Sequence, residues 1–179
     1  MTIQKIDQYS LSITPHNLFD VKSVLLTCGD LRTGQFNAMT IGWGAIGTMW
    51  SKPAAWVAVR PSRFTFEFME KYEDFTLTVF PDSYSAALSL LGTKSGRDGD
   101  KIKASGLTPV ASTLVSSPTF LEAELSIECQ KIYWQDLQPS NFLDPTILKS
   151  YPNQDFHRMY IGEIISIQGE EQYIKQAVK

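Results

Sequence analysis

Two arginines flank a Pro-Ser pair where the sequence reads Arg60-Pro61-Ser62-Arg63-Phe64-Thr65. The Pro-Ser pair suits a helix entry, and apolar residues at helical spacing follow it as far as Lys71. A helix N-terminus presents unpaired N–H groups and the positive end of the helix dipole, so it favours an anion. Two cations and nearby hydroxyls add the charged hydrogen bonds that a phosphate monoester accepts. The segment therefore predicts a phosphate site, and a pair of solvated surface arginines is the simpler alternative.

An aromatic, glycine-rich segment precedes these arginines. We expect an extended strand over 36–41, then a turn that carries Trp43 and passes close to a flat ligand. Residues 42–47 spell G-x-G-x-x-G, yet a strand over 54–59 follows instead of a helix, and no acidic residue closes a second strand about 20 residues later. This context argues against a dinucleotide-binding unit. Trp43 and Trp50 have the alternative role of filling the core or an interface.

Other chemistry-bearing residues are sparse. The polar stretch 93–101 holds cations and glycines that can close over an anion, or it is a solvated loop, and its spacing is not that of a Walker A motif. The two histidines, His16 and His157, have no cysteine or carboxylate at metal-ligand spacing, so we predict no metal site. No hydrolase motif is present. Any redox chemistry should therefore belong to a cofactor.

Composition further limits the class of protein to which this chain can belong. A chain of 179 residues, 43% hydrophobic with a net charge of −3, suits one globular domain over 1–179 and argues against nucleic acid as the main partner. The N-terminus lacks the pattern of a signal peptide, and no apolar run is long enough to cross a membrane. Cys28 and Cys129 lie in strand-like segments and are predicted to be buried, reduced thiols, which suits a cytoplasmic protein.

The elements that must position these residues are mostly short strands. We expect strands at 21–28, 36–41, 54–59, 75–80, 119–133 and 160–167, and helices at 64–71 and 86–91. Asp82 or Ser83 is the expected cap of the second helix and Gly92 its end, and 134–156 is a long excursion. The strand at 75–80 should be half-buried. Glu122, Glu124 and Glu128 should share a solvent-facing side. This pattern favours a small β-barrel over a parallel sheet.

Taken together, these motifs resemble a known family. The matching segments are Asn37-Ala38-Met39-Thr40, Trp43, Val59 to Thr65, Ser95-Gly96-Arg97-Asp98 with Asp100-Lys101, Glu128-Cys129, Asn141-Phe142-Leu143-Asp144-Pro145, and His157 to Ile164. In this order they resemble the flavin reductase-like family of FMN-binding split barrels, most closely its flavoredoxin-type branch. The resemblance covers nearly the whole chain. Gly42 departs from it, because many members have serine before the tryptophan.

The resemblance implies a mainly β fold, a Greek-key split β-barrel with a few added α-helices. It also implies a homodimer with FMN in a cleft at or near the subunit interface. The implied cofactor-binding residues are Asn37, Met39, Thr40, Trp43, Arg60, Pro61, Ser62, Arg63, Thr65, Ser95, Gly96 and Lys101. His157 is implied to lie near the open face of the flavin.

The resemblance further implies an FMN-binding oxidoreductase. Our hypothesis is that NADH or NADPH reduces the FMN, which then passes electrons to free flavin, a ferric complex, a quinone or a partner protein. A non-catalytic FMN electron carrier, reduced by a partner protein, is the first alternative. A barrel that binds another phosphorylated or aromatic molecule is the second. The oxidase branch that acts on pyridoxine-type substrates is disfavoured, because its substrate-clamping motifs are not evident.

Overall fold

The computed structural model describes residues 2–176, and strands form most of its regular structure. The strands are β1 (Gln4–Lys5), β2 (Val24–Asp30), β3 (Gln35–Ile41), β4 (Gly44–Met49), β5 (Lys52–Val59), β6 (Asp74–Val79), β7 (Pro109–Val110), β8 (Thr119–Phe120), β9 (Leu125–Asp136) and β10 (Arg158–Gly169). The α-helices are α1 (Phe64–Lys71), α2 (Ser85–Thr93) and α3 (Lys101–Ser105). The mainly β fold with a few helices is therefore confirmed.

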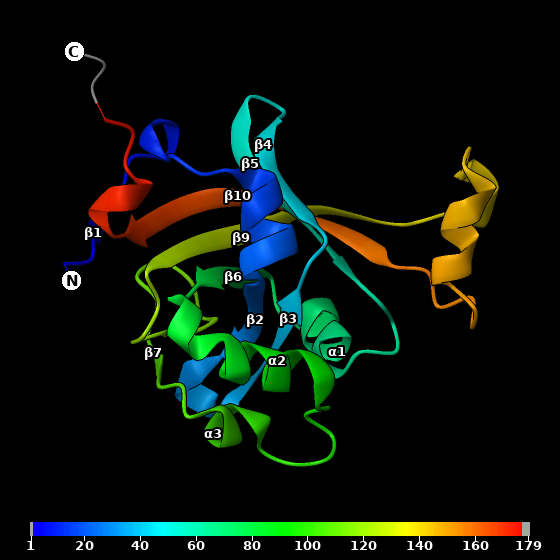
Figure 1. The fold of residues 1–179 in the computed structure, drawn as a ribbon, viewed down its shortest axis with the longest axis horizontal. Coiled ribbons are helices and arrows are strands. Elements are labelled where there is room, and N and C mark those ends of the chain that lie inside the picture. The colour runs from blue at the N-terminus through cyan, green and yellow to red at the C-terminus, as the bar shows by residue number, and fades with distance from the viewer. Residues whose placement is uncertain (1, 177–179) are drawn as a thin grey trace.

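The main sheet is antiparallel and runs in the order β3-β2-β6-β9-β10-β5-β4, with β1 added to β10 (Figure 1). This order departs from the order along the chain, as a Greek-key arrangement requires, because β6 pairs with both β2 and β9. Strands β3 and β4 end the path, and no described residues pair them with each other. The barrel is therefore split between β3 and β4, where residues 42–43 carry the chain across.

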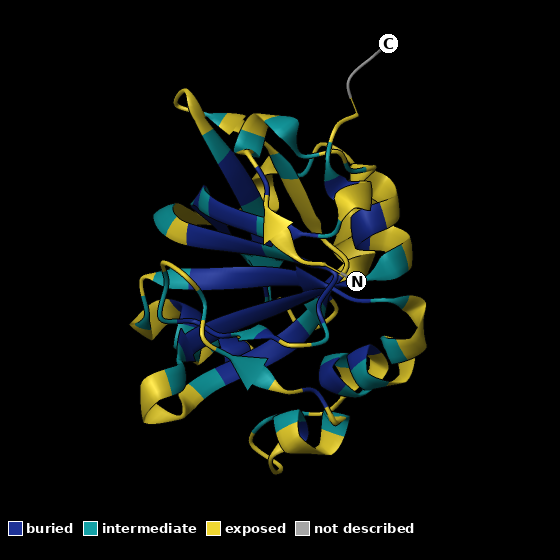
Figure 2. Cartoon of the chain, turned by 90° about the vertical axis from the view of Figure 1, so that its left-hand side faces the viewer, coloured by how far each residue is buried: buried dark blue, intermediate teal, exposed yellow. Residues whose placement is uncertain are grey.

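Two apolar clusters hold the barrel and its helices together. The main cluster fills the barrel, and α1 adds Met69 to it. The second cluster joins α2 to the outer side of the sheet through Leu25, Ala38, Leu88 and Leu91. Figure 2 shows the central strands buried and the turns and outer helix faces exposed. Each fully buried leucine of this kind contributes roughly 2 kcal/mol through removal from water.

Strand β6 is not half-buried as predicted. Its alternation of threonine and apolar residues suggested one wet face, yet Thr76 and Thr78 are fully buried. The Thr76 hydroxyl donates to the Pro118 carbonyl at 2.6 Å, so the polar side of β6 is covered and satisfied. Alternation identifies residues that share a face, but it does not tell whether another layer covers that face.

The first strand begins later than predicted. A π-helical segment, Asn17–Lys22, occupies the residues before β2 and buries Leu18 and Phe19. Val21 is 72% exposed, so it is not a strand residue. Ser23, with φ of 66°, ends the helical segment and turns the chain into β2.

The glycine-rich segment is a strand rather than a turn. Residues 44–49 form β4, which pairs with β5, and Pro53 lies inside β5 opposite Thr48. The hairpin turns at Trp50 and Ser51, whose φ values of 50° and 60° are those of a tight two-residue β-turn. The bend at 42–43 remains where we expected it, and a strand after it confirms that no dinucleotide-binding helix begins here.

The long strand predicted at 119–133 is two strands. Residues 121–124 separate β8 from β9, and β9 continues to Asp136. The prediction that the glutamates face solvent is wrong for Glu124 and Glu128, which are 6% and 2% exposed. Glu128 accepts hydrogen bonds from the backbone N–H groups of Thr113 and Leu114 at 2.9 and 2.7 Å. A distant loop therefore satisfies this carboxylate and buries it.

Helix α2 differs from the prediction at both ends. A 3₁₀ turn, Asp82–Tyr84, precedes it, and the residue before its first turn, Tyr84, makes no side-chain cap. Gly92 lies within the helix, which ends at Thr93. A side chain at Gly92 would approach Thr40 Cβ to 3.2 Å, so glycine lets α2 pack closely on β3. This close packing brings the C-terminal end of α2 beside the start of α1.

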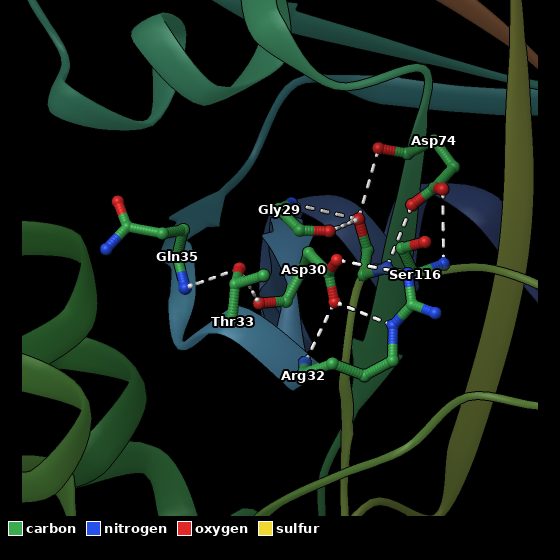
Figure 3. Close-up of polar contacts among 8 residues, drawn as sticks. Gly29, Asp30, Arg32, Thr33, Gln35, Asp74 and Ser116 are labelled. Carbon is green, nitrogen blue, oxygen red and sulfur yellow. Dashed lines mark hydrogen bonds and ion pairs between the residues drawn. The ribbon is translucent and has the colours of Figure 1, made fainter.

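Strands β2 and β3 form an antiparallel hairpin, and a polar network fixes its turn (Figure 3). Asp30 accepts from the backbone N–H of Arg32, and the Thr33 hydroxyl donates to the Asp30 carbonyl. Gly29 has φ of +137°, and a Cβ there would lie 2.3 Å from the Gln35 carbonyl oxygen, so the position requires glycine. The network keeps β3 in register, and β3 supplies one wall of the site described below.

Residues 137–157 form a protruding segment that we call the arm. It contains the short 3₁₀ helices Pro139–Asn141 and Pro145–Ser150, and it stands away from the barrel at the right of Figure 1. At its base the Leu137 N–H donates to the His157 carbonyl at 3.0 Å. No helix within residues 2–176 is long and apolar enough to span a membrane.

Both cysteines are buried, as predicted, and neither forms a disulfide. Cys28 Sγ donates to the Asp74 carbonyl, and burial raises its pKa to about 12. Burial also raises the pKa of the Cys129 thiol above its usual range. Both groups are therefore inert thiols at neutral pH.

Candidate functional site

A cavity of about 190 Å³ lies at the split of the barrel, and we call it the ring cavity. Its lining residues come from the end of β3, the bend that follows, the end of β5 and the base of the arm: Met39, Thr40, Ile41, Gly42, Trp43, Ala58, Arg60, Arg63 and His157. Trp43 is 49% exposed, so its ring is a wall and not part of the core. The cavity therefore offers an aromatic, partly apolar surface at a place where two sheet edges are unpaired.

A second hollow of about 80 Å³ lies beside the ring cavity, and we call it the cationic hollow. The two share Met39 and Arg63. The other lining residues come from the start of α1, the end of α2 and the loop after it: Ser62, Phe64, Thr65, Leu91, Gly92, Thr93, Lys94, Ser95 and Lys101. One molecule with a flat ring and an anionic tail can therefore occupy both spaces.

The start of α1 supplies donors to the cationic hollow. Arg63 precedes the first turn and makes no side-chain cap, so the first N–H groups of the helix stay open to a ligand. Thr65 is 1% exposed and accepts from Asn37 Nδ2 at 2.7 Å. This bond uses an oxygen lone pair of Thr65 and leaves its hydroxyl proton free to donate. Asn37 thus orients Thr65 from behind.

Lys101 enters the cationic hollow from α3. Its Nζ donates to the carbonyls of Leu91 and Lys94 at 2.9 and 3.1 Å, at the C-terminal end of α2, which leaves one N–H for a ligand. Burial, and secondly the positive charge of Arg63, lowers the pKa of Lys101 to about 8. No ion pair within residues 2–176 joins either cation to a carboxylate. Two like charges beside a hollow are stabilised by an anion between them.

The loop over 94–100 folds back on the start of α1. Gly96 fits there because a Cβ would lie 2.6 Å from Asn37 Oδ1 and 2.7 Å from Phe64 Cδ1. Arg97 holds the loop in place by donating to Glu67 at 2.5 Å and to the Ser62 carbonyl at 3.3 Å. Gly96 and Asn37 therefore shape the cationic hollow from outside its lining.

Arg60 lies apart from the cationic hollow. Its guanidinium donates to Asp155 at 2.7 Å and to the Ser150 carbonyl at 2.8 Å, and it covers the ring of Tyr151. The Ser62 hydroxyl also donates to Asp155. Arg60 lines the ring cavity, but its charge is already paired with the arm. The structure thus gives Arg60 and Arg63 different surroundings, although the sequence motif treats them alike.

His157 lies at the base of the arm and lines the ring cavity. It is 8% exposed, and its ring centroid lies 4.7 Å from that of Trp43. Its Nδ1 and the Tyr151 hydroxyl are 2.8 Å apart. Burial, and secondly the charge of Arg60, lowers the pKa of His157 to about 4, so its imidazole is neutral at pH 7.

Most of the predicted site residues come together. Met39, Thr40, Trp43, Arg60, Ser62, Arg63, Thr65, Ser95, Lys101 and His157 line one of the two spaces. Asn37 and Gly96 support them, whereas Pro61 is an exposed turn residue that lines neither space. Their roles toward FMN remain predictions. Trp50 lies at the tip of the β4–β5 hairpin and is absent from both linings.

Sequence reasoning missed the support that comes from the arm and α2. Tyr151 and Asp155 lie in a segment without periodicity, so no local pattern indicated their packing on Arg60. At the end of α2 the sequence offered one signal, Gly92, which we interpreted as the helix end and which instead lets α2 pack closely on β3. Within residues 2–176, no group of three or more histidine, cysteine or acidic side chains is placed to hold a metal ion.

Comparison with known proteins identifies the family. The model of the flavin reductase-like domain matches residues 19–177. The chain belongs to the flavin reductase-like family. A curated protein of Pyrococcus abyssi, described as uncharacterized, is 26% identical over 118 residues, which are 65% of this chain and 56% of that protein. The match thus spans little more than half the length of that curated relative.

Solved structures of family members share the fold. An FMN-binding domain of a flavin reductases-like enzyme from Shewanella baltica has a TM-score of 0.69 at 18% identity, over 96% of this chain and 78% of that one. Flavoredoxin of Desulfovibrio vulgaris has a TM-score of 0.65 at 22% identity, over 90% and 75%. A Shewanella frigidimarina protein with a split barrel domain has a TM-score of 0.66 at 19% identity, over 88% and 73%. The expected split-barrel fold is thus confirmed.

Proposed function

We propose that this flavin reductase-like protein binds FMN across the two joined spaces and works as an NAD(P)H-dependent oxidoreductase. One observation carries the proposal: Arg63 and Lys101 are cations without a carboxylate partner in residues 2–176, and they flank a hollow that opens into the ring cavity. A phosphate dianion relieves their repulsion and accepts from Thr65 and the start of α1. The residues present therefore fit FMN.

Each part of the site has a separate task in this proposal. Arg63, Lys101 and Thr65 bind the phosphate, while Met39 and Trp43 hold the ring at the split of the barrel. When bound, FMN supplies the hydride and electron chemistry that the chain's own side chains do not. The wall formed by the half-exposed Trp43 and the buried His157 orients a second ligand. We place no proton transfer on His157, whose lowered pKa keeps it neutral.

The test begins with the purified protein and its absorbance. A yellow protein, or one that turns yellow on titration with FMN and is bleached by NADH or NADPH, supports the reductase. Arg63→Ala should weaken the binding of FMN in the same titration. A colourless protein that does not bind FMN would overturn the proposal. It would favour a barrel that binds another phosphorylated or aromatic ligand.

A non-catalytic electron carrier is the second candidate. Its support is that flavoredoxins from Desulfovibrio vulgaris and Methanosarcina acetivorans share the fold at TM-scores of 0.65. A carrier would hold FMN but stay yellow with NADH and NADPH until a partner reductase is added. The same cuvette experiment therefore separates the two candidates. Free flavin, a ferric complex, a quinone and a partner protein are the electron acceptors to compare.

We also propose that the protein is a homodimer working in a reducing compartment such as the cytoplasm. The exposed arm side chains Leu143 and Leu148 support the first part, and the two buried free thiols support the second. Light scattering at several concentrations tests the dimer. A monomeric mass that does not change with concentration or FMN would overturn it.

A further inference from the structure

Tyr151 is the nearest polar neighbour of His157, and the contact joins the arm to the ring cavity. Tyr151 follows the 3₁₀ helix Pro145–Ser150 and is 4% exposed. Its hydroxyl lies 2.8 Å from His157 Nδ1, and the two rings meet nearly edge to face at 81°. The guanidinium of Arg60 lies over the tyrosine ring, with Cζ 4.8 Å from its centroid. The hydroxyl is therefore fixed in direction.

Burial, more than the surrounding charges, keeps His157 neutral. Arg60, after β5, and Arg63, before α1, face it with positive charges, and Asp155 in the arm is the one acidic side chain that opposes them. Because Arg60 and Asp155 are paired with each other, their effects on the imidazole partly cancel. Burial then decides the balance and lowers the pKa of His157 to about 4. A neutral imidazole carries its proton on only one ring nitrogen.

The Tyr151 hydroxyl determines which nitrogen of the neutral His157 carries the proton. Within residues 2–176 its only hydrogen-bond partner is His157 Nδ1, so its proton has no other protein acceptor. Burial raises the pKa of Tyr151, which keeps the phenol protonated. The hydroxyl therefore donates, Nδ1 accepts, and the imidazole proton must lie on Nε2. Nε2 is on the far side of the ring from Tyr151 and has no hydrogen-bond partner among the described residues.

We propose that Tyr151 is a positioning residue that holds His157 as a neutral Nε2–H donor toward the ring cavity, where it binds the carbonyl oxygen of a planar ligand. The identity of that ligand rests on the proposed function. Two sources share this chemistry: a carbonyl on the ring of FMN, and a carbonyl on the electron acceptor, such as a quinone. An N–H donor binds an oxygen lone pair, and it repels a cation or another N–H donor at the same place.

The tautomer is measured directly by ¹⁵N NMR of the imidazoles in the free protein. The chain has two histidines, so the spectrum is simple, and the exposed His16 serves as the internal reference. We expect a pyridine-type Nδ1 and a pyrrole-type Nε2 for His157 at pH 7. Tyr151→Phe removes only the hydroxyl and should give a mixture of the two tautomers. Tyr133→Phe, which loses an exposed hydroxyl away from both spaces, should leave His157 unchanged.

Two binding measurements then distinguish the sources of the carbonyl. If FMN supplies it, Tyr151→Phe should weaken FMN binding by about threefold to tenfold. If the acceptor supplies it, FMN affinity should be unchanged, and the KM for menadione should rise by about the same factor with little change in kcat. The KM for ferricyanide, which has no carbonyl, should not rise. Either pattern supports the proposal.

Three results would overturn it. The first is a protonated Nδ1 on His157 in the wild-type protein, which needs no variant and does not depend on folding of a mutant. The second is a His157 tautomer that Tyr151→Phe leaves unchanged. The third is unchanged FMN affinity together with an unchanged KM for menadione. If the protein does not bind FMN at all, the proposed function is refuted, and so is the claim that His157 binds a carbonyl of FMN or of its electron acceptor. The NMR measurement still determines the tautomer of His157 in that case.

Discussion

The affinity for FMN should fall steeply between pH 7 and pH 9 because of Lys101. In the free protein burial and Arg63 lower the pKa of this lysine to about 8, from an ordinary value of 10.5. The phosphate of FMN is a dianion throughout this pH range, since its second pKa is about 6. The protonated lysine is therefore the form that binds. As the pH rises through 8, FMN must compete with the loss of that proton, so affinity decreases.

The magnitude follows from the same pKa. At pH 9 the free protein holds about ten deprotonated Lys101 side chains for each protonated one, so the apparent Kd should be about tenfold higher than at pH 7. This corresponds to ~1.4 kcal/mol of binding free energy. Titration of FMN followed by quenching of its fluorescence, at constant ionic strength, measures the change.

Two substitutions at the same position isolate the cause. Lys101→Arg keeps its positive charge at every pH used, so its affinity should be nearly constant from pH 7 to pH 9. Lys101→Met should bind FMN weakly and with little pH dependence. A wild-type Kd that does not change over this range would refute the reasoning. So would a slope that persists in Lys101→Arg, because some other group would then be titrating.

Three further predictions concern the cationic hollow, a buried carboxylate and the attachment of the arm. Arg63→Ala should weaken FMN binding about tenfold or more through loss of charged hydrogen bonds, while the exposed Lys103→Ala should not, as fluorescence titration will show. Glu128→Ala should lower the free energy of unfolding by about 2 kcal/mol in urea, because two backbone N–H groups lose their acceptor. Arg60→Ala should speed chymotrypsin cleavage within 137–157 severalfold, since Arg60 joins the arm to the barrel.

Each of these has a result that contradicts it. Equal losses in Arg63→Ala and Lys103→Ala would indicate a diffuse effect of charge and not a specific site. An unfolding midpoint unchanged in Glu128→Ala would mean that water replaces the carboxylate at no cost. Unchanged cleavage in Arg60→Ala would show that other contacts, such as the packing of Tyr151 and His157 on Trp43, are enough to hold the arm.

Local patterns were sufficient where neighbours in the sequence determine the structure. The helix predicted to enter at Pro61 and Ser62 and to run through Lys71 is found as Phe64–Lys71, because its entry residues and apolar spacing are local features. Strand β10 extends the prediction of 160–167 by two residues at each end. The β2–β3 hairpin follows from its own turn residues. The family resemblance then added the residues of the loop over 94–101.

Burial of polar groups depended on layers that no local pattern describes. Glu128 alternates like a solvent-facing residue, and a loop 14–15 residues earlier in the chain covers it. Alternation repeats every two residues and says only which side chains share a face, so it cannot tell whether a distant segment caps that face. Strand β4 was unexpected because its glycines suggested a turn, yet every residue of β4 pairs with β5.

The sequence by itself determined that a helix with a cationic start follows an aromatic, glycine-rich segment. Only the tertiary structure decided that Arg63 faces the cationic hollow while Arg60 is paired with the arm, because the partner of Arg60 lies 95 residues further along the chain. The same is true of His157, whose protonation and direction depend on Tyr151, Arg60 and burial together. A pKa and a hydrogen bond depend on which groups are close in space. The sequence lists those groups, but only the folded structure shows which of them are neighbours.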